Sequence, residues 1–242
     1  MIIALDEEQC RVVASKAIKG GKYFCQGCGQ HLCPKQGLVR RPHFAHLSGK
    51  ACEYITNKTE WHYEWQERFG LENSEIVFSY KGYKHIADIQ IGNKVIEFQH
   101  SRISERDVYE RNSFYSYWGL KVVWIFDIRK DYEEQEIRCY EKRPGYNWLY
   151  EWYKPKRSVL EALEMDAGVF LQVTDNYLIK ITWYPNGDNW VKLNKFAGNI
   201  MKKEYAIKRI KKSIDNNYKP KLIIPEDLLD EQIEMKNNGL IM

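Results

Sequence analysis

The fold is decided by residues 85–127, which read HIADIQIGNKVIEFQHSRISERDVYERNSFYSYWGLKVVWIFD. The pair Gly92-Asn93 separates two segments in which apolar and polar residues alternate, His85–Ile91 and Lys94–Gln99. A Gly-Asn pair between two such segments is typical of a β-hairpin. We therefore expect two antiparallel strands joined by this turn.

A helix and a further strand follow the hairpin. Ser104 and Asp107 form a capping pattern, so a helix is expected over residues 104–118. The run KVVWIFD at 121–127 is mostly apolar, which favours a strand covered on both faces. Two upstream segments complete the pattern: a helix over 57–70 and a strand over 76–80. The order helix, strand, hairpin, helix, strand predicts an α/β core with a mixed sheet.

Working outward, the chain divides into three parts. Residues 1–55 form an N-terminal strand and a short Cys- and Gly-rich module, and residues 56–130 form the α/β core. Residues 131–242 form a C-terminal α+β region, with a hairpin over 170–184 and a helix over 195–214. One side of that helix is apolar, and the other is either a solvated face or a contact surface for the DNA backbone. The basic side carries Lys202, Lys203, Lys208, Arg209, Lys211 and Lys212.

The composition sets broad limits on function. The 242 residues include 44% hydrophobic side chains, which is ordinary for a globular protein with a buried core. The net charge of +4 permits a polyanionic partner without requiring one. No apolar run is long enough to span a bilayer, and the N-terminus lacks the features of a signal peptide. We expect a cytoplasmic protein that does not enter a membrane.

A group of cysteines and histidines near the N-terminus predicts a structural zinc site. Four of the six cysteines lie between residues 25 and 52, and in a reducing compartment such a cluster indicates metal ligands rather than disulfides. Zinc needs four ligands, and five candidates are present, so Cys3His is the first choice and Cys2His2 the second. On a strand the two histidines would point to opposite faces, which favours only one of them. The five candidates are Cys25, Cys28, His43, His46 and Cys52.

Two carboxylates on the hairpin predict a second metal site. Asp88 lies on the first strand, and Glu97 and Gln99 share a face of the second. Converging carboxylates make a hard oxygen site that suits Mg²⁺ or Mn²⁺, and such a metal can polarise a phosphodiester. Glu97 is the charged residue of an otherwise apolar strand, and a buried carboxylate needs a cation or strong donors. The alternative is a structural salt bridge with Arg102, Arg106 or Arg111.

These residues resemble the competence protein CoiA family over roughly residues 20–130. The resemblance implies a PD-(D/E)XK restriction-endonuclease-like fold with a zinc-finger-like N-terminal module, in a family associated with DNA taken up for recombination. A fold by itself does not establish activity. The resemblance rests on Cys25-x-x-Cys28, His43-Phe44-Ala45-His46, His62, Asp88, Glu97-Phe98-Gln99, Ser101, Ile103-Ser104, Arg111 and Tyr115.

By that resemblance, Asp88 and Glu97 are the carboxylates that bind Mg²⁺. Gln99 stands at the place of the lysine in the general PD-(D/E)XK pattern, as it does in similar family members. A glutamine can hydrogen-bond to water but carries no charge. Gln66 is a second departure, because a lysine is expected in that helix.

The resemblance also implies supporting residues. A glutamate of the preceding helix often joins such sites, and Glu60 is preferred here over Glu64. His62 matches the histidine of the family's helix and is expected to support the metal-bound water or bind phosphate. Arg111, with Tyr115 one turn later and Ser101 before the helix, is expected to contact the substrate.

Three functions are compatible with the sequence. The first is a Mg²⁺-dependent nuclease that hydrolyses DNA in uptake, recombination or the processing of foreign DNA. The second is a non-catalytic DNA-binding adaptor that delivers DNA or a recombinase, which the two glutamine departures favour. The third is a protein-interaction subunit of a defence or mobile-element complex.

Overall fold

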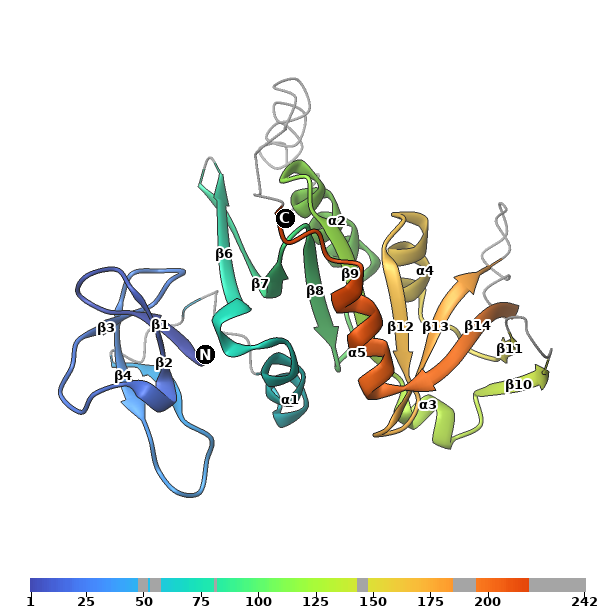
Figure 1. Cartoon of the computed structure of the whole chain (residues 1–242), viewed down its shortest axis with the longest axis horizontal. Coiled ribbons are helices and arrows are strands. Elements are labelled where there is room, and N and C mark those ends of the chain that lie inside the picture. The colour runs from blue at the N-terminus through green and yellow to red at the C-terminus, as the bar shows by residue number, and fades with distance from the viewer. Residues whose placement is uncertain (48–51, 53–57, 81, 143–147, 185–194, 218–242) are drawn as a thin grey trace.

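The chain forms two β-sheets of unequal size. The computed structural model describes residues 1–47, 52, 58–80, 82–142, 148–184 and 195–217. The small N-terminal sheet has the strand order β2-β1-β3-β4-β5, and a 3₁₀ turn, η1, spans Ala14–Lys16 (Figure 1). Its strands are β1 (Ile3–Leu5), β2 (Arg11–Val13), β3 (Tyr23–Phe24), β4 (His31–Lys35) and β5 (His43–His46).

The larger sheet is mixed and has nine strands in the order β10-β11-β14-β13-β12-β9-β8-β7-β6. Strand β9 runs parallel to both of its neighbours, β8 and β12, and the other pairs are antiparallel. The strands are β6 (Ser74–Tyr80), β7 (Tyr83–Ile91), β8 (Lys94–Gln99), β9 (Lys121–Asp127), β10 (Ile137–Glu141), β11 (Trp148–Trp152), β12 (Gly168–Gln172), β13 (Tyr177–Trp183) and β14 (Lys195–Lys202).

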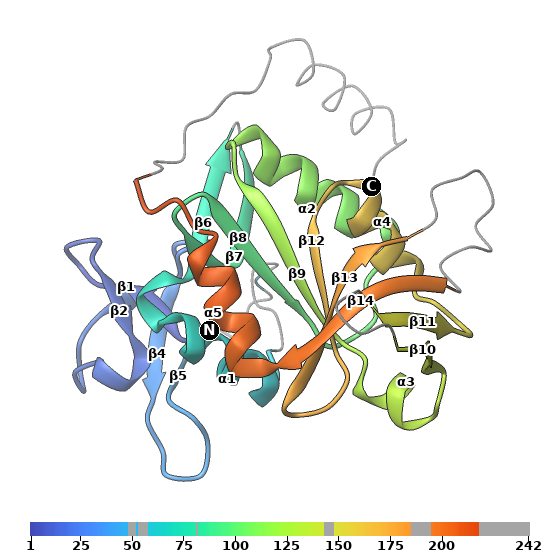
Figure 2. The ribbon, with the colours of Figure 1, turned by 45° about the vertical axis from the view of Figure 1, so that its right-hand side comes forward.

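Helices cover both faces of this sheet. Apolar residues of α1 and α5 pack on one face, and apolar residues of α2 and α4 pack on the other, so the sheet is the middle of three layers (Figure 2). Because β9 lies between these layers, six of its seven residues are buried, as its apolar sequence predicts. The helices are α1 (Glu60–Phe69), α2 (Glu105–Tyr117), α3 (Arg129–Glu133), α4 (Arg157–Glu164) and α5 (Lys203–Lys212), with a 3₁₀ turn η2 (Leu71–Asn73).

Local sequence signals explain the elements around the hairpin. Gly92, in the turn between β7 and β8, has a φ of 53°, which a side chain disfavours. The Ser104 hydroxyl accepts a hydrogen bond from the Asp107 backbone N–H and caps α2. Helix α1 ends at Gly70 as expected, but it begins at Glu60 after Thr59, later than the expected start at Asn57, which itself lies outside the described residues. The hairpin, α2, β9 and the mixed α/β architecture are thus confirmed.

The expected helix over 195–214 is wrong in its first half. Residues Lys195–Lys202 form β14, which pairs with β11 and β13, and only Lys203–Lys212 are helical. Phe196 and Ile200 are four residues apart, a spacing that places two residues on one face of a strand as well as on one side of a helix. Phe196 stacks on Tyr150 of β11, with 5.2 Å between the ring centroids. Backbone pairing with β11 and β13, together with this stacking, stabilises the strand over the helix.

The part of the chain after residue 131 continues the same sheet. Strands β10 to β14 join it through the parallel pairing of β12 with β9. The helices of the described residues include none that is both long and apolar enough to cross a membrane.

The N-terminal module packs against the β6–β7 edge of the large sheet. Arg11 of β2 donates to the carbonyl of Glu72 at 2.7 Å, and the Gln26 side chain donates to the carbonyl of Glu75 at 3.2 Å. Lys84 of β7 donates to the carbonyl of Gly27 at 2.6 Å. Gly27 lies inside the Cys25–Cys28 turn, so the turn that carries two of the expected zinc ligands contacts the large sheet.

Candidate functional site

Four of the five expected zinc ligands lie together in the N-terminal module. The ligand atoms of Cys25, Cys28, His46 and Cys52 are all within 4.8 Å of one another. The Cys28 Sγ is 3.2 Å from His46 Nε2, and the Cys25 Sγ is 4.0 Å from the Cys52 Sγ. Ligand atoms bonded to a tetrahedral zinc at about 2.0–2.3 Å are separated from one another by distances similar to those between Cys28 and His46 and between Cys25 and Cys52. This Cys3His cluster can therefore bind zinc.

The fold separates the two histidines of β5. His46 faces the cysteines, whereas His43 contacts the carbonyl of Arg41 at 2.9 Å through its Nδ1. Residues three apart on a strand point to opposite faces, which accounts for the separation. Burial raises the pKa of the Cys25 thiol to about 12, and a bound cation would reverse that effect by stabilising the thiolate. The cluster has the closed ligand set of a structural site.

Three carboxylates lie in a row across β6, β7 and β8. The pairs Ser74↔Ile89 and Ile76↔Ala87 place Glu75 opposite Asp88. Continuing the β7–β8 register by one residue beyond Ile89↔Ile96 places Asp88 opposite Glu97. All three carboxylates are buried.

Asp88 is held by one cation and one backbone donor. Its Oδ1 is 2.7 Å from the Nζ of Lys58, and its Oδ2 accepts the Phe98 N–H at 3.0 Å. Burial opposes ionisation, but the charges of Lys58 and His62 outweigh it and hold the Asp88 pKa below its usual range. Asp88 is therefore a buried carboxylate that stays ionised.

Glu97 has partners from α2. Its Oε2 lies 2.7 Å from the Nη1 of Arg111, and its Oε1 accepts the hydroxyl of Tyr115 at 2.8 Å. Burial, assisted by the charge of Asp88, raises the Glu97 pKa to about 7 despite Arg111. Arg111, expected as a phosphate contact, thus forms the salt bridge that the sequence left as the alternative.

Glu75 connects this site to the N-terminal module. Its Oε2 accepts the backbone N–H groups of Ile2 and Ile3, each at 3.0 Å, and its Oε1 is 3.4 Å from the Nζ of Lys58. Glu75 has a φ of 52°, a conformation that costs a non-glycine residue about 1–3 kcal/mol and persists only where surrounding contacts offset that cost. The N–H groups of Ile2 and Ile3 hold the Glu75 side chain in place.

His62, which was expected in the site, and Gln66, which stands where a lysine was expected, lie close to the carboxylates without touching them. The Nε2 of His62 is 2.9 Å from the carbonyl oxygen of Phe98, and its Nδ1 is 3.0 Å from the Thr59 hydroxyl. Gln66 donates to the backbone carbonyl of Asp88 at 3.2 Å. These contacts place α1 against β7 at Asp88 and against β8 at Phe98.

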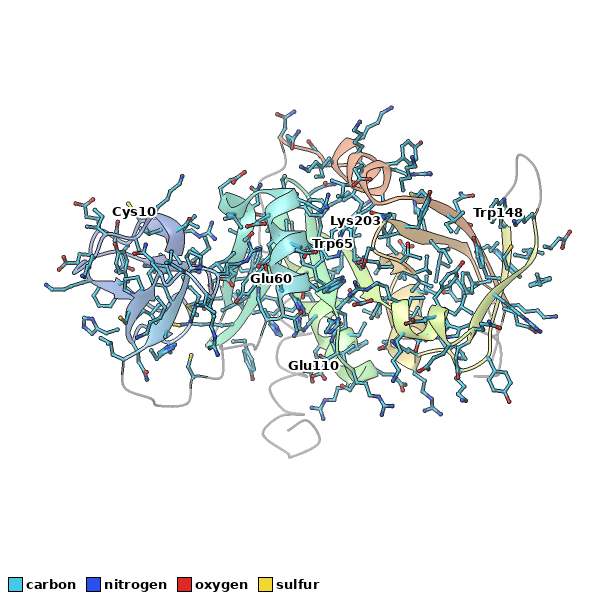
Figure 3. The ribbon with its side chains drawn as sticks, turned by 90° about the horizontal axis from the view of Figure 1, so that it is seen from below. Cys10, Glu60, Trp65, Glu110, Trp148 and Lys203 are labelled. Carbon is cyan, nitrogen blue, oxygen red and sulfur yellow. The ribbon has the colours of Figure 1, made fainter. Side chains whose placement is uncertain are left out.

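Gln99 and Glu60 make other contacts. The amide of Gln99 donates to the carbonyl of Ser101 at 2.8 Å, with the Ser101 hydroxyl at 3.4 Å. Glu60 forms an ion pair with Arg41 of the N-terminal module and is largely exposed. Figure 3 shows Glu60 and Trp65 on α1, with Lys203 beside Trp65. Among the described residues, no contact joins Glu60 to Asp88 or Glu97.

Sequence reasoning missed Lys58 and Glu75. Lys58 precedes α1 by two residues, and Glu75 is the second residue of β6, so neither lies within a recognisable motif. Glu75 could have been noticed as the charged residue that begins the run EIVF, by the argument already used for Glu97. No local pattern marks Lys58, because its partners lie 17 and 30 residues away in the chain.

Two protein-family models match adjacent parts of the chain. The N-terminal domain of competence protein CoiA matches residues 7–55, and the CoiA nuclease-like domain matches residues 58–182. The chain belongs to the CoiA family. The Cys3His cluster therefore lies in the CoiA N-terminal domain, and the three carboxylates lie in the nuclease-like domain. No curated protein and no solved structure matched the chain.

The nuclease-like domain of this CoiA family member has a donor set that suits a divalent cation. Each oxygen of Asp88 and Glu97 accepts one protein donor, and a carboxylate oxygen retains a second lone pair for a cation. Three carboxylates face two cationic side chains, Lys58 and Arg111, so the cluster keeps one unbalanced negative charge when all are ionised. Hard oxygen ligands with excess negative charge favour Mg²⁺ or Mn²⁺.

Proposed function

We propose that this CoiA family member is a metal-dependent DNA nuclease with a PD-(D/E)XK-type core. Asp88 and Glu97 would hold Mg²⁺ or Mn²⁺, and the substrate would be DNA taken up by the cell or foreign DNA. The observation that carries the proposal is the pair of buried carboxylates opposite one another on β7 and β8. Burying two carboxylates at one place is costly unless cations compensate them.

The bound metal would polarise the phosphodiester and lower the pKa of a bound water. Neighbouring residues would orient the two carboxylates that hold the metal. Arg111 and Tyr115 hold both oxygens of Glu97 in a fixed direction, and the Phe98 N–H does the same for one oxygen of Asp88. Both ring nitrogens of His62 are bonded, one to Thr59 and one to the carbonyl of Phe98, so His62 would hold the start of α1 against β8.

The test is cleavage of single- and double-stranded DNA with Mg²⁺ or Mn²⁺, compared with the same reactions in EDTA. The variant is Asp88→Asn, which keeps the shape of the side chain and removes its charge. Glu110→Gln is the matched control, because Glu110 lies on α2, is partly exposed and pairs with Arg106. We expect metal-dependent cleavage by the wild type and the control, and its loss in Asp88→Asn. An Asp88→Asn protein that unfolds at the wild-type temperature and cleaves DNA at the wild-type rate refutes the assignment.

A second function, a DNA-binding adaptor that does not cleave, is favoured by one observation. The Gln99 side chain, at the place of the pattern's lysine, donates to Ser101 rather than toward Asp88 or Glu97. An adaptor would bind DNA in a salt-dependent way, with no effect of Mg²⁺ and no cleavage. The same set of reactions, followed by a DNA-binding assay, separates the two functions.

A further inference from the structure

Lys58 is a buried cation next to the candidate metal carboxylates. Its side chain is 9% exposed, and its Nζ lies 2.7 Å from Asp88 Oδ1 and 3.4 Å from Glu75 Oε1. Removing an ammonium group from water is costly, so a buried lysine is retained where charged partners or a function need it. Glu75 already accepts two backbone N–H groups through its other oxygen, and Asp88 accepts one.

The other places where the site could carry a lysine hold glutamine. Gln99 donates to Ser101, and Gln66 donates to the backbone carbonyl of Asp88. The second cation of the cluster, Arg111, is bound to Glu97. Among the described residues, Lys58 is therefore the cation that contacts Asp88 by an ion pair.

We propose that Lys58 is the lysine of this active site, placed there by the segment before α1 instead of by strand β8. Its ammonium group contacts the scissile phosphate or the attacking water beside Asp88 and offsets negative charge as the phosphodiester is attacked. This inference rests on the proposed nuclease function and adds a residue to it. A lysine is suited to this task because its three donors rotate on a flexible stem.

A purely structural role for Lys58 makes different predictions. As a tie between Glu75 and Asp88, Lys58 would affect the stability of the contact between the N-terminal module and the large sheet. A positive charge moved to position 99 would not restore that tie, because Gln99 lies on β8 near Ser101 and makes no described contact with Glu75. A charge that serves the reaction could be supplied from either side of Asp88.

The experiment compares the wild type with Lys58→Met, Lys58→Arg and the double variant Lys58→Met/Gln99→Lys. Loss of a preorganised charge-stabilising donor typically lowers turnover by about 10²–10³-fold, and we expect a decrease of that size in Lys58→Met. We expect partial activity in Lys58→Arg and at least about tenfold recovery in the double variant. Glu75→Gln breaks the structural side of the bridge and is expected to reduce stability more than turnover.

A second measurement does not depend on catalysis. Mg²⁺ that binds the folded protein raises its unfolding temperature. Removing the Lys58 charge beside Asp88 removes repulsion of the metal, so Lys58→Met is expected to bind Mg²⁺ more tightly while turning over more slowly. Tighter Mg²⁺ binding in Lys58→Met with unchanged turnover would show that Lys58 only ties Glu75 to Asp88.

The outcomes separate the inference from the proposed function. If the wild type cleaves DNA and Lys58→Met cleaves equally fast, the inference on Lys58 fails and the nuclease assignment stands. Failure of Gln99→Lys to recover any activity, together with unchanged Mg²⁺ binding in Lys58→Met, also overturns the inference. Absence of cleavage by the wild type instead removes the proposed function itself.

Discussion

The buried carboxylate of Glu97 makes stability depend on pH in a way that one substitution can isolate. Its pKa is raised from 4.5 to about 7, chiefly by burial. The folded protein therefore holds a proton that the unfolded chain has lost between these two values. Stability from this group is fully present below about pH 4.5 and is lost as the pH rises through about 7.

The magnitude follows from the size of the pKa shift. A rise of about 2.5 units, the difference between about 7 and 4.5, corresponds to about 3 kcal/mol at about 1.4 kcal/mol per unit. Glu97 is 1% exposed, so solvent screening reduces this value little. Glu97→Gln removes the titrating group and keeps the side chain's size.

The assay is urea-induced unfolding of the wild type and Glu97→Gln, without added Mg²⁺, at several pH values between about 5 and 8. We expect wild-type stability to fall relative to Glu97→Gln by up to about 3 kcal/mol across this range. Added Mg²⁺ should recover wild-type stability at about pH 8, where Glu97 is ionised, and have little effect at about pH 5. Parallel pH profiles for the two proteins would refute the reasoning, because they would show that Glu97 does not titrate in this window.

Two further predictions concern the zinc cluster and the cap of α2. Cys28→Ser is expected to lose bound zinc and to unfold at a lower temperature, as measured by elemental analysis and a thermal melt. Cys10→Ser changes an exposed cysteine outside the cluster and should keep the zinc content and the unfolding temperature of the wild type. Equal zinc content in the two variants would contradict this ligand set. Ser104→Ala is expected to cost about 1 kcal/mol in urea unfolding because the Asp107 N–H loses its cap, and an unchanged unfolding midpoint would show that the cap contributes nothing.

The elements of this protein that follow from sequence are those specified by neighbouring residues. The turn at Gly92-Asn93 fixes the register of β7 and β8, and that register brings Asp88 opposite Glu97. The cap at Ser104 starts α2 at the expected residue. The Cys25-x-x-Cys28 turn indicates the module in which the Cys3His cluster lies. In each case the residues that determine the element are close together in the sequence, so a local pattern is enough to predict it.

Other features depended on partners far away in the chain. The residues of β14 have a spacing compatible with helix and strand, and only the two neighbouring strands decide between them. His46 rather than His43 lies among the cysteines, because the face of β5 that carries His46 is the one next to them. Glu60, expected beside the carboxylates, instead pairs with Arg41, which no pattern in its own helix predicts.

The feature that the sequence predicted least completely is the row of three carboxylates with its buried lysine. Asp88 and Glu97 lie on the two strands of one hairpin, so the position of the turn predicts that they are close together. Glu75 and Lys58 come from separate segments, and they come close to Asp88 only through the pairing of β6 with β7 and the position of Lys58 just before α1. The sequence determined which carboxylates could act, and the tertiary structure decided which charges surround them, because electrostatic interaction depends on distance in space and not on separation along the chain.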